Sequence, residues 1–351
     1  MIETKVLDPN LMEAEFYAKE LKLSYSALNK LLTAPSIYYR EYVLKEREES
    51  YGKHLLEGVL IHYLVLDKQG FDDKFIIMSD SLPSPNNMEI ADEIFKIYEK
   101  MVEENPGIHE NLELFDFEEE ILAALIAIPL WQGLKDTKDG TGDSKRIAKI
   151  VDKRTEEYFT FLKNKKGRTI IDSAMLDKCS KRAEIVNTNK AMRDLLGMDL
   201  ASDGVEFGVY NELPIDTKKQ PGLAFGFKGI LDNMVVDVKN KVVRINDFKT
   251  TSKSLTDFPE SVEYWNYWLQ AIMYIRLATD FLEEHMDDSW SIEFKFVVFD
   301  RFDQLYAFPV SNETLIEWNE RFNNTLKHAS HHYTERDYTL PYDFIVGNIN
   351  L

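Results

Sequence analysis

The spacing of apolar residues changes once along the chain, from a helical period to the alternation that is typical of strands. Up to about residue 203 apolar residues recur at helical spacing, and after it they alternate with polar residues over short runs. Ser24 is a suitable N-cap for the first helix, and Pro35 favours the start of the second. The third helix is apolar on nearly all sides, which predicts that it is buried. The helices predicted in this part span residues 24–33, 36–46, 54–67 and 172–196.

The second part of the chain predicts a β-sheet interrupted by one long helix. Asp237 to Lys241 form a polar turn that joins two strands in a hairpin. The long helix runs from Pro259 to about Leu282, and Asn312 is the expected cap of a last helix that ends near His328. This order predicts an α+β fold, or an α/β fold with a mixed sheet, whose sheet core covers residues 203–310. The strands predicted within it span residues 204–215, 224–236, 242–248, 291–299 and 305–310.

Residues 86–168 are predicted to be helical and carry an uneven charge. Between residues 101 and 120 there are eight acidic residues and no Lys or Arg, whereas nine Lys and Arg accompany three acidic residues between 144 and 168. A loop at 135–144, rich in Gly, Asp and Thr, separates the two stretches and is expected to be mobile. Lys145, Lys149 and Lys153 would form one stripe along a helix. Such a stripe is either an ordinary solvated face or a surface that tracks DNA phosphates.

The composition restricts the class of protein. The chain has 351 residues, a net charge of −19, 44% hydrophobic residues and a single cysteine, Cys179. These values exclude global disorder, an internal disulfide framework and any cluster held by several thiolates. The longest apolar run, 121–131, is too short to cross a bilayer, and the first ten residues lack an apolar signal segment. We therefore expect a cytoplasmic protein that is not inserted in a membrane. The acidic balance argues against a general DNA coat but allows a nuclease with a local basic channel.

Two predicted strands carry side chains suited to metal-assisted hydrolysis. Asp247 and Lys249 are two apart on one strand and therefore share a face, while the carbonyl of Phe248 lies between them. Asp232 ends the preceding strand, and Gly229 allows close backbone approach there. Two carboxylates and a carbonyl are the hard oxygen ligands that Mg²⁺ or Mn²⁺ prefers, and a nearby lysine can orient water or offset phosphate charge. The chain holds other acid-x-Lys triplets, of which only Glu293-x-Lys295 also lies in a strand, and it lacks an upstream acid.

The segments GFKGILD and RINDFKTT resemble the signature of the PD-(D/E)xK nuclease superfamily. Two further segments resemble motifs of the same family. GVLIHYLVLD resembles its Gly-x-x-x-His helix, which would make His62 a metal ligand, and WLQAIMY resembles its Gln-x-x-x-Tyr motif, with Gln270 and Tyr274. The opening SYSALNKLLTAPSIYY resembles the start of RecE-type phage exonucleases. The relatives with an iron–sulfur cluster need four cysteines, so the RecE and lambda-exonuclease branch without a cluster fits best.

The resemblance implies one nuclease domain over residues 1–351, with a restriction-endonuclease-like mixed sheet flanked by helices and with 86–168 as a helical, charged insertion. It implies a metal-dependent exonuclease that hydrolyses linear double-stranded DNA from its ends for phage-type recombination, in the host cytoplasm. The protein would assemble into a ring-like homo-oligomer, and a single-strand annealing protein would be its partner. The residues it implicates at one or two Mg²⁺ or Mn²⁺ ions are His62, Glu212, Asp232, Asp247 and the Phe248 carbonyl, with Lys249 orienting water and Gln270 and Tyr274 positioning water or DNA.

Other interpretations remain open at this point. An endonuclease on the same core would use the same residues, and a non-catalytic acidic interaction protein or DNA mimic would retain the fold alone. His62 could be a core histidine, Glu212 an outward-facing strand carboxylate, and Gln270 with Tyr274 a buried polar pair in an aromatic-rich helix. A decayed core would be expected to lose Lys249 or one aspartate, whereas here the set is intact.

Overall fold

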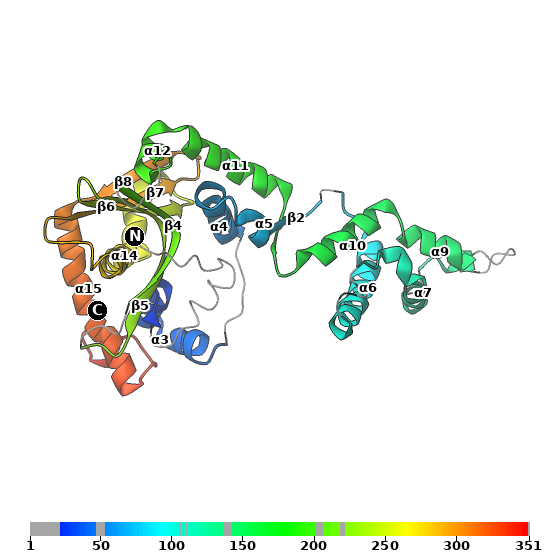
Figure 1. Cartoon of the computed structure of the whole chain (residues 1–351). Helices are drawn as coiled ribbons and strands as arrows, with labels where there is room; N and C mark the ends of the chain where they lie inside the picture. The colour runs from blue at the N-terminus through cyan, green and yellow to red at the C-terminus, as the bar shows by residue number, and fades with distance from the viewer. Residues whose placement is uncertain are drawn as a thin grey trace. The chain divides into compact units, whose positions relative to one another are not determined.

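The computed structural model describes residues 22–46, 53–79, 81–105, 107, 109, 111–128, 130–135, 142–200, 206–217 and 222–349 (Figure 1). The predicted connection at 136–141 and the predicted strand start at Gly204 lie outside these ranges. The chain divides into two compact units, one made of Met1–Phe71 and Lys178–Leu351 and the other of Asp72–Asp177. Each is described separately below. None of the helices in the described ranges combines the length and the apolar character needed to cross a membrane.

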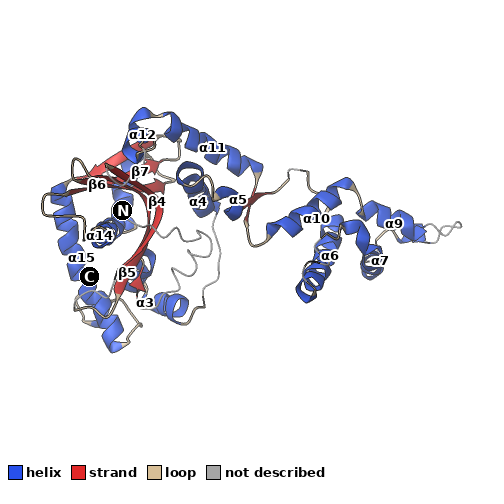
Figure 2. Cartoon of the chain, viewed as in Figure 1, coloured by secondary structure: helices blue, strands red, loops and turns tan. Residues whose placement is uncertain are grey.

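The first unit is built on a six-stranded mixed sheet, which Figure 2 shows in red with helices around it. The strands β5 and β6 form the predicted hairpin, β6 and β7 are parallel, and β4 and β8 pair antiparallel with β5 and β7. The mixed sheet flanked by helices confirms the predicted fold class, and two strands have the predicted bounds. The strands are β1 (Lys22–Leu23), β4 (Phe207–Asp216), β5 (Gly226–Asp237), β6 (Val242–Thr250), β7 (Ser291–Phe299) and β8 (Leu305–Val310).

The strands β5 and β6 separate part of the way along the sheet. Their pairing runs from Asp237 and Val242 to Asn233 and Asn246 and stops there. Beyond that point β6 continues beside β7 alone, and the start of β5 pairs instead with β1 in a parallel register. The first residues past the last pair are Asp232 on one strand and Asp247 on the other. Both acidic side chains therefore lie at the mouth of a fork in the sheet.

The helices of this unit follow the predicted ranges at their starts more closely than at their ends. Ser24 caps α2 by accepting a hydrogen bond from the amide of Ala27 at 3.3 Å, as predicted. The cap of α15 is Ser311 and not Asn312, because the Ser311 hydroxyl accepts from Thr314. The helices are α2 (Tyr25–Thr33), α3 (Pro35–Tyr38) with a π-helical turn (Tyr39–Val43), α4 (Lys53–Leu66), α11 (Ser173–Thr188), α12 (Lys190–Leu196), α13 (Phe258–Tyr264), α14 (Tyr267–Phe281), α15 (Asn312–Glu335) and α16 (Tyr342–Ile345), with a 3-10 turn at Leu255–Asp257.

Two of the predicted helices are each divided in two. The helix predicted over 172–196 breaks at Asn189, whose side chain accepts from the amide of Met192 and so starts α12. The helix predicted over 259–282 breaks at Trp265 and Asn266, because Asn266 adopts the left-handed conformation with φ +55°. The apolar pattern continues across both breaks, so it could not reveal them.

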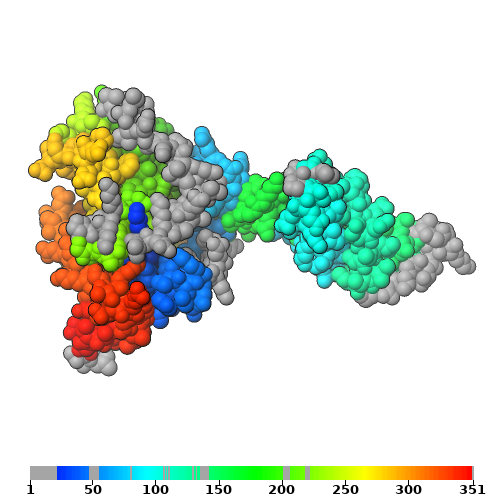
Figure 3. Space-filling model, turned by 60° about the horizontal axis from the view of Figure 1, so that its bottom comes forward, coloured from blue at the N-terminus to red at the C-terminus, as the bar shows by residue number. Residues whose placement is uncertain are grey.

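The core of the first unit holds α14 tightly against β5. A Cβ atom added to Gly229 would lie 2.8 Å from Leu277 and 2.9 Å from Tyr274 on that helix, so only glycine permits this approach. Figure 1 shows α14 on one side of β4 and β5 and α4 on the other side. On the face shown in Figure 3, the C-terminal segment in red lies beside the N-terminal helices in blue, and the rings of Tyr39 and Tyr338 stack there at 5.0 Å.

The second unit is mainly helical, with a two-stranded parallel sheet formed by its first and last segments. Its apolar core includes Ile94, Phe117, Ile121 and Phe159. The predicted helical stretch 86–168 lies within this unit. Its elements are α5 (Phe71–Lys74), β2 (Phe75–Ile77), α6 (Pro85–Glu104), a 3-10 turn (Leu114–Phe117), α7 (Glu118–Ala127), α8 (Gln132–Lys135), α9 (Gly142–Ile150), α10 (Lys153–Lys165) and β3 (Thr169–Ile171).

The prediction of a single lysine stripe on one helix is wrong. Lys145 and Lys149 lie on α9, which ends at Ile150, and Lys153 is the first residue of α10. The carboxylate of Asp152 accepts a hydrogen bond from the amide of Thr155 at 2.9 Å and thereby starts the new helix. The Lys149 ammonium lies 5.5 Å from the centre of the Trp131 ring, and Lys153 pairs with Glu157 at 3.8 Å.

Candidate metal centre at the strand fork

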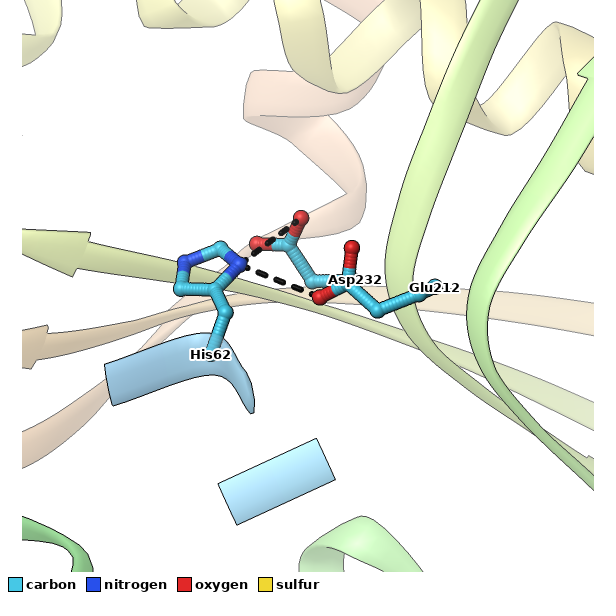
Figure 4. A group of neighbouring side chains, drawn as sticks. All are labelled: His62, Glu212 and Asp232. Atoms are coloured by element: carbon cyan, nitrogen blue, oxygen red, sulfur yellow. Dashed lines mark hydrogen bonds and ion pairs between the residues drawn. The ribbon is translucent and has the colours of Figure 1, made fainter. Parts of the chain in front are cut away.

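Three side chains from distant parts of the chain meet at the fork: His62 from α4, Glu212 from β4 and Asp232 from β5 (Figure 4). The Nδ1 atom of His62 lies 3.1 Å from Glu212 Oε1 and 3.7 Å from Asp232 Oδ1. One ligand atom from each residue lies within 4.8 Å of the other two. An imidazole and two carboxylates that converge in this way form a set of donors suited to a divalent cation.

The backbone of Glu212 is strained in the middle of β4. Its φ is +46°, in the left-handed region that a side chain with a Cβ seldom adopts inside a strand. It lies opposite Asp232, between the register pairs Asn211–Asn233 and Leu213–Leu231. This conformation costs on the order of 1 kcal/mol or more, and such strain is concentrated at functional sites. Here it accompanies a carboxylate that points at His62, so Glu212 is not a plain outward-facing strand residue.

A second group of side chains joins this cluster from β6 and α14. The amide of Phe248 donates to Asp232 Oδ2 at 2.7 Å, so the fork is closed by a side chain where the backbone ladder has ended. The ammonium of Lys249 forms an ion pair with Asp247. On the other side of that carboxylate, the Nε2 atom of Gln270 donates to Asp247 Oδ1 at 3.0 Å. Asp247 is completely buried, and its orientation is therefore set from both sides.

The charges in the cluster shift one another's pKa values. Burial alone would lower the pKa of His62, but the carboxylates of Asp232 and Glu212 outweigh it and raise this pKa to about 9. Burial raises the pKa of Asp247 to about 6, although the Lys249 ammonium opposes the shift. Burial also raises the pKa of Asp232, which His62 partly offsets. Burial acts to lower the pKa of Lys249, yet its carboxylate neighbours raise it overall, so Lys249 carries a positive charge.

A ladder of three asparagines, which no sequence pattern predicted, supports the site. The side-chain amide of Asn246 donates to Asn233 at 2.7 Å, and that of Asn233 donates to Asn211 at 2.8 Å. The ladder crosses β6, β5 and β4, and its members directly adjoin Asp247, Asp232 and Glu212 in the chain. In the sequence, an asparagine lies next to an acidic residue in each of the three strands. This repetition becomes visible only when the strands are aligned by their register.

The same ladder attaches two helices to the sheet. Asn211 donates to the carbonyl of Leu66, the last residue of α4, at 3.1 Å. Asn233 and Asn246 donate to the carbonyls of Leu196 and Leu195 at the end of α12. Helix ends leave carbonyl groups without partners, and these amides satisfy them. The helix that carries His62 is therefore tied to the strands that carry the carboxylates.

The predicted roles of the remaining residues are not tested by their positions. Tyr274 is 7% exposed and packs in the core against Gly229, so its predicted contact with DNA stays a prediction. The carbonyl of Phe248 accepts from the Lys249 ammonium at 3.4 Å, and its role as a metal ligand is likewise only predicted. Lys145, Lys149 and Lys153 belong to the second unit, and their predicted contact with DNA stays a prediction.

The residues at the fork fit a divalent cation. His62, Glu212 and Asp232 converge there from three different elements, with Asp247 close by on β6. Hydrogen bonds from the Phe248 amide and the Gln270 side chain hold Asp232 and Asp247 in place. Oxygen donors suit Mg²⁺ and Mn²⁺, and an imidazole nitrogen favours the transition metal of the two. Three carboxylates here face two cations, Lys249 and the protonated His62, and a divalent cation that replaced the His62 proton would compensate the remaining negative charge.

Comparisons with known proteins give one distant structural likeness. The chain matches no family model and no curated protein. Among solved structures it is similar to that of a protein from Eubacterium rectale that is provisionally described as an exonuclease, over 92% of this chain and 87% of that one. The sequence identity is 11% and the TM-score is 0.44, a likeness too distant to support an argument about function.

We expect His62 to link the stability of the metal-free protein to pH. Because its folded pKa of about 9 exceeds the ordinary value, its stabilising effect is complete below about pH 6.5 and is lost as the pH rises through 9. The expected loss is on the order of 3 kcal/mol. Urea unfolding in EDTA would compare the protein with His62→Gln at pH 6.5 and pH 10. The two proteins should differ at pH 6.5 and converge at pH 10, and a constant difference would show that His62 acts only through packing.

Proposed function

We propose that the protein is a metal-dependent nuclease that hydrolyses phosphodiester bonds of DNA. The observation that carries this proposal is the convergence of His62, Glu212 and Asp232 at one fork in the sheet, with Asp247 and its ion-paired Lys249 on the facing strand. A purely structural ion pair would not require four buried or half-buried acidic and imidazole groups from four elements, because each adds a cost of desolvation.

Each residue has a distinct part in the proposed reaction. A divalent metal bound to these ligands would supply a water of lowered pKa and would stabilise negative charge on the phosphate. His62, Glu212 and Asp232 form the ligand group on one side of the fork, and Gln270 holds the Asp247 carboxylate in a fixed rotamer on the other. Lys249 is positively charged, so it donates hydrogen bonds to the attacking water or the phosphate and does not accept the proton.

The finer assignment is an exonuclease that acts on linear double-stranded DNA with Mg²⁺ or Mn²⁺. It is supported by the motifs around His62, Asp232, Asp247 and Gln270, which resemble those of the PD-(D/E)xK superfamily, and by the opening segment SYSALNKLLTAPSIYY, which resembles the start of RecE-type phage exonucleases. A role in recombination, a homo-oligomeric ring and an annealing partner belong to the same proposal. An endonuclease would use the same centre, so the choice between the two depends on substrate topology.

One gel separates these activities. Purified protein is incubated with linear duplex and with covalently closed circular duplex, each with Mg²⁺, with Mn²⁺ or with EDTA. The proposal expects loss of the linear duplex with either metal, an intact circle, and no reaction in EDTA. Cutting of the circle would show that the protein is an endonuclease and not an exonuclease. Reaction in EDTA, or no reaction under any condition, would contradict a metal-dependent nuclease.

A further inference from the structure

Two exposed aromatic side chains lie at the break between α13 and α14. Tyr264 is 74% exposed and Trp265 is 51% exposed, and their rings meet edge to face with centroids 4.7 Å apart. Exposing two large aromatic rings side by side is unfavourable in water, and such surfaces usually mark a binding site. The pair is called the aromatic platform below.

The backbone beneath the aromatic platform is held in place by a polar network. The carbonyl of Trp265 accepts hydrogen bonds from the hydroxyl of Tyr25 and from the side-chain amide of Asn29 on α2. Asn266 adopts a left-handed conformation, and its side chain connects Asn29 to the indole of Trp268. These hydrogen bonds hold a strained turn in place, and the turn leaves the side chain of Trp265 exposed. The residues that make them are Tyr25, Asn29, Asn266 and Trp268. A turn that only joined two helices would need neither the strain nor this network.

The aromatic platform adjoins the candidate metal centre through α14. Tyr267 lies two residues after Trp265, a distance of at most about 7 Å along the chain. The ring of Tyr267 faces the Lys249 ammonium at 5.0 Å. One turn further along the helix, Gln270 holds Asp247. The turn that carries Trp265 therefore lies next to the residue whose ring faces the Lys249 ammonium.

The charges around the aromatic platform are balanced rather than basic. Glu263, which precedes Tyr264, pairs with Arg321 at 2.8 Å, and Glu260 on the same helix pairs with Lys253 at 3.3 Å. A surface that bound phosphates would present cations without partners. Flat aromatic rings in a neutral setting instead suit the face of a nucleobase, which stacks on Trp or Tyr irrespective of its sequence.

We infer that the aromatic platform binds an unpaired base of the nucleic acid by stacking on Trp265, next to the phosphodiester held at Lys249. This inference rests on the proposed function. It extends that function by predicting that the substrate strand is unstacked at the cleavage site, so that single-stranded or frayed ends are preferred. A partner protein is the competing occupant, and the experiment below separates the two.

The test measures the anisotropy of fluorescent oligonucleotides in EDTA, where metal-dependent hydrolysis cannot occur. The probes are single-stranded DNA and duplexes with a single-stranded tail of either polarity. Trp265→Ala should weaken binding of its preferred probe about tenfold, as expected for one stacked base, whereas Trp265→Phe should retain most of the affinity. Phe302→Ala, which removes another exposed aromatic ring, is the matched control and should leave the affinity unchanged.

A cycle with abasic probes gives the decisive result. Removing the stacked base should weaken binding to the wild-type protein about tenfold and should cause no further loss in Trp265→Ala. If abasic positions affect both proteins equally, or if Trp265→Ala binds every probe like the wild type, the inference is wrong and the platform faces a protein. Hydrolysis by the wild type in Mn²⁺, measured alongside, keeps the outcomes apart. Hydrolysis by the wild type together with binding that does not depend on Trp265 overturns the inference alone, and absence of hydrolysis with Trp265-dependent binding overturns the proposed function alone.

Discussion

Replacing Lys249 with alanine should lower the rate of DNA hydrolysis about a hundred- to a thousandfold. The Lys249 side chain is 14% exposed, and its ammonium is held between the Asp247 carboxylate and the ring of Tyr267, where a positive charge acts strongly on a developing negative charge. The loss should appear in kcat more than in KM, because the interaction strengthens as charge builds on the phosphate. Single-turnover cleavage of a labelled linear duplex in Mn²⁺ measures this effect.

The Lys249→Ala variant should still fold. The Asp247 carboxylate that loses its partner already has a pKa raised to about 6 by burial, so it can take up a proton instead of remaining as a buried charge. The cost to stability is therefore limited near neutral pH and increases as the pH rises. Circular dichroism and thermal melting of the variant at pH 6.5 would check that the loss of rate does not reflect unfolding.

Lys295→Ala is the matched control for this prediction. Lys295 belongs to the rival triplet Glu293-x-Lys295, lies on the adjacent strand β7 in register with Asn246, and pairs with Glu293 at 3.1 Å. No carboxylate cluster surrounds it in the described residues, so its removal should leave the rate within about twofold of the wild type. Full activity in Lys249→Ala, together with loss in Lys295→Ala, would mean that the active strand is β7 and that the fork at Asp232 and Asp247 is structural.

Local patterns in the sequence predicted most of the elements of the sheet unit, and long-range contacts decided what they missed. The strands β7 and β8 have the predicted bounds because alternation over six to nine residues is a local signal. The break at Asn266 depends on Asn29, more than 230 residues away, which no local pattern can contain. The lysine stripe failed for the opposite reason. Asp152 is a local cap signal, and this cap divides the single helix that the charge spacing alone predicts.

In the candidate site, too, local signals could be predicted from the sequence and long-range contacts could not. Asp247 and Lys249 could be predicted together because two residues on one strand share a face. His62 and Glu212 are 150 positions apart, and only the resemblance to a family suggested that they lie near the same metal. The asparagine ladder could not be predicted, since an isolated asparagine in a strand indicates a turn or a bulge more often than a buried hydrogen bond. Its meaning depends on the register of three strands.

The asparagine ladder leads to the second large prediction, for Asn233→Ala. Asn233 is fully buried, and its side chain donates to Asn211 and to Leu196 and accepts from Asn246. Its removal leaves three polar groups with one partner fewer each, which should lower the free energy of unfolding by about 2–4 kcal/mol. Urea unfolding followed by tryptophan fluorescence reports on this unit, since four of the five tryptophans, 265, 268, 290 and 318, belong to it.

The same substitution should also reduce hydrolysis under conditions in which the protein remains folded. The ladder fixes the register from which Asp232 and Asp247 enter the fork and ties α4, with His62, to β4. A displacement of about 1 Å in a catalytic arrangement commonly costs a hundredfold in rate. Asn240→Ala is the matched control, because Asn240 belongs to the same hairpin and donates to Asp237 at 2.8 Å but is exposed. It should change stability by less than about 0.5 kcal/mol and leave the rate unchanged. If Asn233→Ala were destabilised yet fully active, the ladder would support the fold without positioning the carboxylates, and the geometry of the fork would have to be maintained by Gln270 and the Phe248 amide alone.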